Sequence, residues 1–204
     1  MKRIIIASNN AHKIEEIKAI LQIPDCEIVS LREAGISLDP EENGQSFEEN
    51  ALIKARALYE ISHCAVIADD SGLCVEALDG APSIHSARFA GEHGNDEANN
   101  KKLLALLKNY SKQEDRKAYF ACVIAFIDAK GNESCFEGRC KGFIGTEAVG
   151  DKGFGYDPLF YPLEFGLSLS FAQVPQETKS EISHRGRALE QLRAHLKSTE
   201  YKNL

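Results

Sequence analysis

The sequence of 204 residues predicts an α/β fold with a mixed β-sheet. Short apolar runs bounded by polar residues, such as residues 4–7 and 65–68, are typical of buried strands. Residues 12–21 carry apolar side chains on one helical face, so strands and helices alternate. A long apolar strand at residues 117–128 is joined by the turn 129–132 to a second long strand, which predicts antiparallel pairing. The sheet is therefore expected to contain both parallel and antiparallel neighbours.

The other elements follow from similar patterns. Residues 26–29 predict a further strand, and residues 95–108 predict a helix with leucines on its inner side. Ser46 and Glu49 have the spacing of a capping box, so a helix is expected to begin directly after Ser46. A last helix is expected to begin after Ser183 and to bury a stripe of alanine and leucine residues.

The charge and hydropathy of the chain exclude several classes of protein. Its 24 Lys and Arg and 31 Asp and Glu residues give a net charge of −7, whereas a protein that coats nucleic acid needs a basic field. A small polyanion is not excluded, because a local group of basic residues is enough to bind it. No apolar run approaches the ~18 residues of a membrane span, and the N-terminal apolar run is too short for a signal peptide. We therefore expect a cytoplasmic protein that binds neither nucleic acid nor a membrane.

Cysteine and histidine spacing argues against a disulfide framework and against a zinc site. The six cysteines form no C-x-x-C pair, and most lie in apolar runs, which is typical of reduced, buried thiols. No histidine has metal-ligand spacing to a cysteine or to a second histidine on one helical face. We therefore expect no zinc site.

The segment between the first strand and the first helix is a candidate phosphate site. It consists of Ser8, Asn9, Asn10, Ala11, His12 and Lys13. Free backbone amides and the dipole at a helix N-terminus favour an anion, and Lys13 would add a positive charge. The segment lacks the G-x-x-x-x-G-K-[ST] pattern of a Walker A loop. A solvent-exposed turn capped by an asparagine is the alternative interpretation.

Two adjacent carboxylates, Asp69 and Asp70, follow the apolar strand at residues 65–68. They are therefore expected at the carboxyl edge of the sheet, where ligands commonly bind in α/β folds. Adjacent side chains of a strand point to opposite faces, so one aspartate would serve a site while the other has a structural role. The alternative is an Asx turn in which Gly72 takes a positive φ.

Residues 153–158 form a glycine-flanked aromatic segment that also carries a carboxylate. Phe154 or Tyr156 can stack on a nucleobase, and Asp157 can accept from a ring N–H, either directly or through backbone that it positions. The alternative interpretation is a tight turn whose aromatic side chains fill the core.

A further candidate segment carries positive charge. Lys179 precedes the predicted last helix, and His184 and Arg185 occupy the first turn of that helix. Cations at a helix N-terminus oppose the helix dipole, which indicates a nearby anion or acceptor. The alternative is that these side chains extend into solvent.

Taken in order along the chain, these segments resemble the inosine/xanthosine triphosphate pyrophosphatase family. The resemblance rests on Ser8-x-Asn10-x-x-Lys13, Glu41-Glu42-x-Gly44-x-Ser46-Phe47-x-Glu49-Asn50-Ala51 with Lys54-Ala55, Ala68-Asp69-Asp70-Ser71-Gly72-Leu73, Gly80-Ala81-Pro82 with Ser86-Ala87-Arg88, Gly153-Phe154-Gly155-Tyr156-Asp157-Pro158, and Lys179 with Ile182-Ser183-His184-Arg185. It covers nearly the whole chain and implies a single nucleoside-triphosphate pyrophosphatase domain over residues 1–204. His12 departs from it, because the family usually has glycine at that position, and residues 166–176 fit it poorly.

This resemblance implies a fold, an activity and a cofactor. The fold would be α/β, with two lobes around a long, strongly twisted mixed sheet, helices packed on the sheet, and the active site in the cleft between the lobes. The activity would be hydrolysis of nonstandard purine nucleoside triphosphates (ITP, dITP and XTP) to the monophosphate and pyrophosphate, which cleanses the nucleotide pool. The family usually forms homodimers and uses Mg²⁺, an ion that prefers carboxylate and phosphate oxygens.

The resemblance also implies roles for the matching residues. Asp70 would be the catalytic carboxylate and a metal ligand, and either Glu41 or Glu42 would supply the second metal contact. The implied substrate-binding residues, whose three lysines would balance the phosphate charge, are Ser8, Asn9, Asn10, Ala11, His12, Lys13, Lys54, Ser71, Phe154, Gly155, Tyr156, Asp157, Lys179, His184 and Arg185.

Three alternatives predict different residues. A protein that binds purine nucleotide without hydrolysing it would lose the acidic residues, which are all present here. A related pyrophosphatase for modified pyrimidine nucleotides is disfavoured by the His184–Arg185 pair and by the Phe154 loop. A nucleic-acid-binding module would need a basic stripe.

The base preference follows from hydrogen-bond chemistry. Arg185 offers donors and no acceptor, so it would suit the keto oxygen at C6 of hypoxanthine or xanthine. The expected order of kcat/KM is therefore ITP and XTP first, GTP lower and ATP lowest.

Overall fold

The structure is a computed structural model that describes residues 2–166, 168–201 and 204. It contains a six-stranded sheet with the strand order β2-β1-β3-β4-β5-β6. The strands are β1 (Lys2–Ile6), β2 (Cys26–Ser30), β3 (Ala65–Val75), β4 (Lys117–Ile127), β5 (Glu133–Ile144) and β6 (Phe160–Pro162). β1 pairs in parallel with β2 and β3, whereas β5 and β6 pair antiparallel. The predicted α/β fold with a mixed sheet is therefore confirmed.

The helices begin within one residue of their predicted starts, with one exception. They are α1 (Ala11–Ile20), α2 (Phe47–Ser62), α3 (Asp96–Leu106), α4 (Gln176–Ile182) and α5 (His184–Ser198). Short 3₁₀ helices cover Glu76–Leu78, Ser83–Arg88, Gln113–Arg116, Leu163–Phe165 and Phe171–Gln173. The exception is α4, which has seven residues and, like the three-residue β6, lacks a predicted counterpart. Elements this short contain too few periods to show a hydrophobic pattern.

The chain forms two compact units. Unit 1 comprises Met1–Asp70, Cys122–Gly138 and Arg185–Leu204, and unit 2 comprises Ser71–Ala121 and Arg139–His184. Strands β3, β4 and β5 contribute residues to both units. Each unit has its own buried apolar core.

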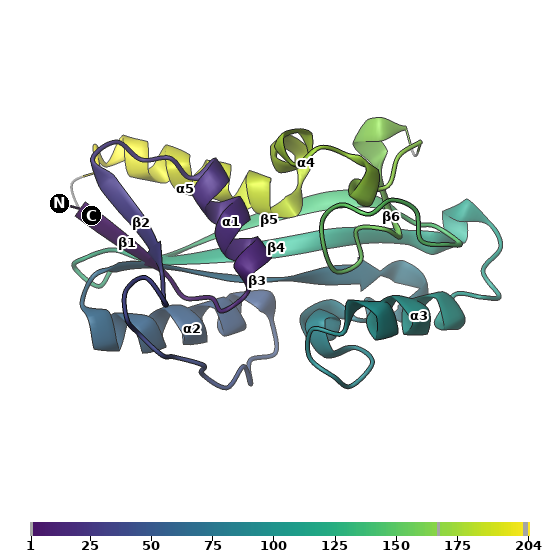
Figure 1. The fold of residues 1–204 in the computed structure, drawn as a ribbon, viewed down its shortest axis with the longest axis horizontal. Helices are drawn as coiled ribbons and strands as arrows, with labels where there is room; N and C mark the ends of the chain where they lie inside the picture. Colours follow the sequence, from purple (N-terminus) through teal and green to yellow (C-terminus); the bar gives the residue numbers. More distant parts are fainter. Residues whose placement is uncertain (1, 167, 202–203) are drawn as a thin grey trace. The chain divides into compact units, whose positions relative to one another are not determined.

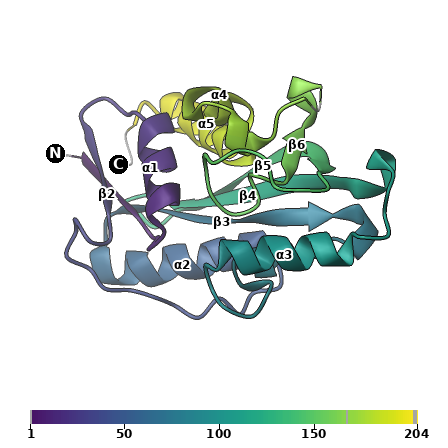
Figure 2. The same cartoon turned by 45° about the vertical axis from the view of Figure 1, so that its right-hand side comes forward.

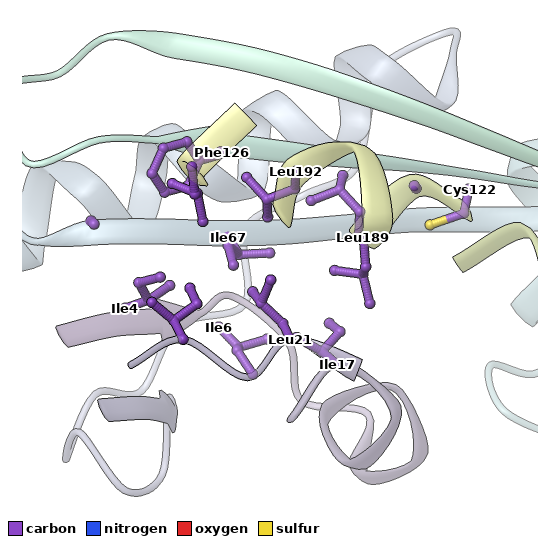
Figure 3. Close-up of a cluster of buried hydrophobic side chains, with 14 residues drawn as sticks. Ile4, Ile6, Ile17, Leu21, Ile67, Cys122, Phe126, Leu189 and Leu192 are labelled. Carbon is purple, nitrogen blue, oxygen red and sulfur yellow. The ribbon is translucent and has the colours of Figure 1, made fainter. Parts of the chain in front are cut away.

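Unit 1 buries apolar side chains on both faces of its strands. Because side chains alternate along a strand, Ile67 of β3 packs on one face and Val66 on the other. Helices α1 and α5 cover the Ile67 face, and α2 covers the Val66 face (Figure 1). Figure 3 shows Ile17 of α1 and Leu189 of α5 beside Ile67 in the first of these clusters. The predicted inner stripe of the last helix is confirmed, and its buried members are Ala188, Leu189, Leu192 and Leu196.

The core of unit 2 is rich in aromatic residues. Phe120, Phe160 and Phe171 pack together, with 4.7 Å between the ring centroids of Phe120 and Phe160. Leu103 of α3 is fully buried in the same cluster. Helix α3 lies on one side of the strands of this unit and α4 on the other (Figure 2).

Strand β3 extends further than the sequence predicts. The pattern predicts a strand at residues 65–68, but β3 continues through Asp69 and Asp70 to Val75. The two aspartates therefore lie inside the strand and not at its carboxyl end, and the alternative of an Asx turn at Gly72 is wrong. Burial explains the difference, since every residue of β3 except Ser71 is buried and its backbone groups need hydrogen-bonded partners.

Helix α2 begins at the predicted residue with a modified cap. Ser46 Oγ accepts a hydrogen bond from Glu49 N at 3.1 Å, as a capping box requires. The Glu49 carboxylate accepts from Gln45 N at 2.6 Å, one residue before the predicted partner. The reciprocal half of the predicted box is therefore wrong, although Glu49 still binds a backbone donor beside the helix start.

No disulfide joins the six cysteines, all of which the structure describes. The buried ones are Cys74, Cys122 and Cys140, and the half-buried ones are Cys26, Cys64 and Cys135. Among the described residues, no helix is both long enough and apolar enough to cross a membrane.

We expect Ile67→Ala to lower the free energy of unfolding by about 2–5 kcal/mol, because truncating this fully buried side chain leaves a cavity. The matched control is Ile61→Ala on α2, where the side chain is 54% exposed and the same change should alter stability by less than about 0.5 kcal/mol. Urea denaturation of the two variants measures the difference. Equal effects of the two substitutions would contradict the packing described for unit 1.

Candidate active site

Asp69 and Asp70 have separate surroundings, as expected for adjacent residues of a strand. Asp69 pairs with side chains from α1 and α5, whereas Asp70 pairs with a side chain from α2. Both carboxylates are buried, with exposed fractions of 1% for Asp69 and 6% for Asp70. The two adjacent aspartates can therefore have two different roles.

Asp69 is held by two cations and a thiol from three other elements of unit 1. Its Oδ2 accepts a hydrogen bond from Arg185 Nε of α5 at 3.0 Å and lies 2.9 Å from Cys122 Sγ of β4. Lys13 of α1 forms an ion pair with Asp69 Oδ1. The Arg185 guanidinium also forms an ion pair with Glu16 of α1. These side chains form a buried charged network that ties α1, β3, β4 and α5 together.

Burial and the charges of this network fix the protonation of Asp69 and Cys122. Burial alone would raise the pKa of Asp69, but the charges of Arg185 and Lys13 outweigh it and hold that pKa well below its usual range. Burial raises the pKa of the Cys122 thiol well above its usual range, and the charge of Asp69 adds to the rise. At neutral pH, Asp69 is therefore an anion and Cys122 a protonated donor.

Asp70 forms a second cluster with Lys54 and Glu42. Lys54 Nζ of α2 lies 3.2 Å from Asp70 Oδ1 and 3.2 Å from Glu42 Oε1. Burial raises the pKa of Asp70 above its usual value, against the opposing charges of Lys54 and Lys13. Burial alone would lower the pKa of Lys54, but Asp70 and Glu42 raise it. Lys54 is therefore charged and is shared by two carboxylates.

The surroundings of Asp70 suit a divalent cation with oxygen ligands. Asp70 Oδ2 is buried and has no hydrogen-bond partner among the residues that the structure describes. Mg²⁺ takes one or two carboxylates and completes its shell with water and phosphate oxygens. In the described part of the chain, no group of three or more His, Cys, Asp or Glu residues is placed to hold a metal ion. Asp70 with one partner carboxylate is a donor set of the kind that Mg²⁺ accepts when water or phosphate oxygens complete its shell.

The structure distinguishes the two candidate partners that the sequence leaves open. Glu42 lies against Lys54, which also contacts Asp70. Glu41 is exposed. Asn50, which is fully buried on α2, accepts a hydrogen bond from Gly44 N at 2.9 Å and so fixes the loop that carries Glu42. This geometry favours Glu42 as the second carboxylate.

The predicted phosphate segment is exposed at the start of α1. Asn10 caps the helix by accepting a hydrogen bond from Lys13 N at 3.1 Å, and Ser8 Oγ accepts from Asn10 N at 3.2 Å. Asparagine capping, the alternative interpretation, is therefore present, and phosphate binding by this segment stays a prediction. Its exposed residues are Asn9, Asn10, Ala11 and His12, and its half-buried residues are Ser8 and Lys13.

In unit 2, Asp157 organises the loop predicted to bind the base. Its Oδ2 accepts hydrogen bonds from Phe154 N at 3.0 Å and from Lys179 Nζ at 2.6 Å. Gly153 has a φ of +73°, and a Cβ at that position would lie 2.0 Å from Asp157 Oδ2, so the turn requires glycine. The arrangement favours an effect of Asp157 through the backbone that it positions.

Lys179 has a partner that differs from the predicted one. Its side chain is 3% exposed, pairs with Asp157, and places Nζ 5.1 Å from the centroid of the Phe154 ring. The charge of Lys179 is thus balanced by a protein carboxylate in unit 2, which indicates a part in fixing the loop. Its predicted contact with substrate phosphate stays a prediction.

Tyr156 belongs to the core of unit 2. It is 4% exposed, its hydroxyl donates to Ser86 O at 2.9 Å, and burial raises the pKa of the phenol. Ser86 Oγ accepts in turn from Leu73 N at 2.9 Å. The alternative in which an aromatic side chain fills the core is therefore correct for Tyr156. Phe154, which is half-buried, is the candidate for stacking on a base.

His184 and Arg185 are both buried, so the alternative in which they extend into solvent is wrong. In unit 2, His184 stacks on Phe120 with 4.7 Å between ring centroids. In unit 1, Nε, Nη1 and Nη2 of Arg185 all bind carboxylates of Asp69 and Glu16. Asp69 and Glu16 are therefore the nearby anions that the sequence predicts from cations at the start of this helix. Direct contact of Arg185 with a purine oxygen stays a prediction.

The sequence did not predict the contacts of Glu16 with Arg185 and of Cys122 with Asp69, nor that of Asn50 with Gly44 in the loop that carries Glu42. Glu16 follows Lys13 by three positions on α1, and residues at that spacing share a helical face. This spacing is the signal that would have found Glu16. Cys122 lies in an apolar run, which gives no signal of a polar partner. Ser71, which was predicted, is half-buried in β3 at the first position of unit 2.

Unit 1 therefore contains two groups of carboxylates and cations, around Asp69 and around Asp70, and unit 2 contains an aromatic loop fixed by a carboxylate. These features define an α/β protein with the properties expected of a nucleotide hydrolase.

The sequence pattern of the Ham1 family matches residues 4–195. The chain is 51% identical over 203 residues to a dITP/XTP pyrophosphatase of Clostridium perfringens, with 97% of this chain and 98% of that relative covered. It is similar to the solved Ham1 protein of Staphylococcus aureus, with 44% identity, a TM-score of 0.86, and coverage of 97% and 100%. It is also similar to the nucleoside-triphosphatase / dITP/XTP pyrophosphatase of Mycobacterium abscessus, with 43% identity, a TM-score of 0.74, and coverage of 93% and 98%.

The chain belongs to the Ham1 family. The resemblance to inosine/xanthosine triphosphate pyrophosphatases that the sequence predicts is thereby confirmed.

The two aspartates should respond differently to the same substitution. Asp69→Asn is expected to lower the free energy of unfolding by about 3–5 kcal/mol, because it removes an anion that balances the buried Arg185. Asp70→Asn should cost less stability, because Lys54 keeps Glu42 as a partner and burial already disfavours the charged form of Asp70. Urea denaturation at pH 7 compares the two variants.

The pH dependence of the Asp69 effect has a definite sign. Because its pKa is lowered, the stabilisation is complete above the ordinary aspartate pKa of about 3.9 and is lost as pH falls through the folded-state value. Equal destabilisation by the two substitutions at pH 7 would contradict the separate environments described for them.

Proposed function

We propose that this chain hydrolyses the nonstandard purine nucleoside triphosphates ITP, dITP and XTP to the monophosphate and pyrophosphate. The observation that carries the proposal is Asp70, a buried carboxylate with a raised pKa, a lysine on one oxygen and a second oxygen without a partner in the described part of the chain. Such a group can bind a cation and accept a proton from water. Membership of the Ham1 family and the name of the C. perfringens relative support the substrate class.

Lys13 and Lys54 are the proposed ligands of the triphosphate, which carries about four negative charges. Each lysine is paired with an aspartate, so its ammonium group is held in place before the substrate binds. The backbone amides at the exposed start of α1 would add donors to the phosphate oxygens. Binding in this way uses positive groups whose positions the protein already fixes.

Asp70 is the proposed general base. Water adds to a phosphorus atom of the α–β anhydride, the bond from phosphorus to the bridging oxygen breaks, and Asp70 accepts the proton that the water loses. Burial brings the pKa of Asp70 closer to the working pH, which makes the carboxylate a stronger base.

Asp70 and Glu42 are the proposed holders of Mg²⁺ in this group of residues. When bound, the ion would neutralise part of the phosphate charge and polarise a phosphoryl oxygen. Lys54 contacts both carboxylates, so its positive charge allows them to lie close together when no ion is bound.

The loop around Phe154 is the proposed purine-binding element of unit 2. Phe154 can stack on any base, so stacking provides affinity without choice. Hypoxanthine and xanthine have a C6 oxygen and an N1–H, whereas adenine has an amino donor and an unprotonated N1. A pocket that donates to C6 and accepts from N1–H can reject ATP by as much as ~10⁴. GTP shares both groups with ITP, so its rejection depends on the 2-amino group and should be weaker.

A homodimer, a cytoplasmic location and a role in cleansing the nucleotide pool are further proposals, and they rest on the resemblance to the family. No contact with nucleic acid or with a membrane is part of the proposed activity.

A panel of nucleotides tests the activity. With Mg²⁺ present, kcat/KM is expected to be highest for ITP and XTP, lower for GTP and lowest for ATP. The assay scores pyrophosphate against orthophosphate, and a reaction in ¹⁸O water should leave the label in the monophosphate or pyrophosphate. Label in orthophosphate, or equal rates with ATP and ITP, would contradict the proposal. Arg185→Ala is unsuitable as a test, because it would leave Asp69 and Glu16 buried without their cation.

Removal of the metal is expected to stop turnover and leave the fold intact, because the proposed ligands are two carboxylates and the substrate. EDTA should abolish pyrophosphate release without changing the circular dichroism, and added Mg²⁺ should restore it. Asp70→Asn should lower turnover by about 10²–10⁴, whereas Asp39→Asn, at an exposed position of the same unit, is the matched control. Full activity in metal-free buffer would overturn this part of the proposal.

A further inference from the structure

Two side chains of α3 bind the backbone of Gly155 in unit 2. Asp96 Oδ2 accepts a hydrogen bond from Gly155 N at 2.6 Å, and Asn100 Nδ2 donates to Gly155 O at 2.9 Å. Asp96 and Asn100 are four residues apart on α3, so they lie on the same helical face. Side chains from one turn of α3 therefore bind both the N–H and the C=O of Gly155.

These contacts orient the peptide groups on either side of Gly155. The N–H and C=O of a trans peptide point in opposite directions, so binding Gly155 N also fixes the direction of the Phe154 carbonyl. By the same reasoning, binding Gly155 O fixes the direction of the Tyr156 N–H. Gly155 has a φ of +65°, which residues with a side chain rarely adopt. Glycine adopts positive and negative φ about equally readily, so its own backbone does not favour this conformation. The helix contacts therefore supply the constraint that the glycine lacks.

A second set of contacts fixes the same loop from within. Asp157 Oδ2 accepts from Phe154 N and from Lys179 Nζ, and Asp157 N donates to Phe154 O at 3.3 Å. Phe154 is thus held by Asp157 through its own N–H and by Asp96 through the peptide bond that follows it. Phe154 O already accepts from Asp157 N at 3.3 Å and keeps a second lone pair. A purine edge beside Phe154 would meet this acceptor and the Tyr156 N–H in fixed directions.

We propose that Asp96 and Asn100 are positioning residues that set the base preference, by holding the Phe154 and Tyr156 peptide groups in the directions that suit a keto purine. This inference rests on the proposed function, in which the Phe154 loop binds the base. Neither side chain is required to touch the nucleotide. Substitution of either residue should therefore change the base preference and KM, while kcat with ITP changes little.

The test compares four variants, three of which change the hydrogen-bonding group that faces Gly155. Asp96→Ala removes the acceptor, whereas Asp96→Asn keeps an acceptor oxygen at the same distance along the side chain. Asn100→Asp replaces the donor by a second acceptor facing the Gly155 carbonyl. Glu97→Ala, at an exposed neighbouring position of α3, is the matched control.

Steady-state kinetics with ITP and ATP should separate these variants. Asp96→Ala and Asn100→Asp are expected to raise KM for ITP by about tenfold and to lower the ITP-to-ATP ratio of kcat/KM by a similar factor. Asp96→Asn should recover most of the wild-type ratio, and Glu97→Ala should match the wild type. A general loss of structure would lower kcat for both nucleotides and leave their ratio unchanged, and this result would overturn the inference.

Calorimetric binding of IMP and AMP gives a readout that needs no turnover. The IMP-to-AMP affinity ratio should fall about tenfold in Asp96→Ala and Asn100→Asp and stay unchanged in Glu97→Ala. If the wild type binds IMP but does not hydrolyse ITP, the proposed function fails and this ratio still decides the positioning role. A ratio that stays at the wild-type value in both folded variants would overturn the inference, as would failure of the wild type to bind IMP.

Discussion

The buried ion pair between Asp69 and Arg185 is the interaction on which unit 1 depends. Arg185 is 1% exposed, and its guanidinium is balanced by Asp69 and Glu16 from two different elements. An unpaired charge at such a position would cost several kcal/mol, so α1, β3 and α5 must meet in one arrangement for each charge to find its partner. Lys13 takes its position from the same network through its ion pair with Asp69. The geometry proposed for phosphate binding is thus a consequence of how the unit is held together.

The alternation of side chains along β3 separates structural work from chemical work. Asp69 faces two cations that lower its pKa and fix it as an anion, while burial raises the pKa of Asp70. One aspartate is therefore stabilised in its charged form by the fold, and the next has Lys54 on one oxygen and no partner on the other in the described part of the chain. A buried carboxylate with a shifted pKa is typical of a functional site.

In unit 2, polar contacts add to the packing of Tyr156 in giving the loop its structure. The loop contains Gly153 and Gly155, which have positive φ and no side chains to pack. Asp157 with Lys179 fixes one part of it, and Asp96 with Asn100 fixes the next. Tyr156 anchors the same loop in the core, which leaves Phe154 as the half-buried ring. A loop with this many polar contacts can present backbone groups in constant directions without a rigid secondary structure.

The sequence by itself determined most of the longer elements and the family, because hydrophobic periodicity and ordered motifs are local properties of the chain. It identified Asp70 and the Phe154 loop as candidates, and it placed most helix starts within one residue. Only the tertiary structure decided that β3 continues to Val75, that Glu42 and not Glu41 faces Lys54, and that Tyr156 fills the core. The partners of Arg185 lie 116 and 169 positions away along the chain. Contacts over such separations depend on how buried faces pack and how buried charges are balanced. Neither the packing nor the charge balance can be predicted from a local pattern of residues.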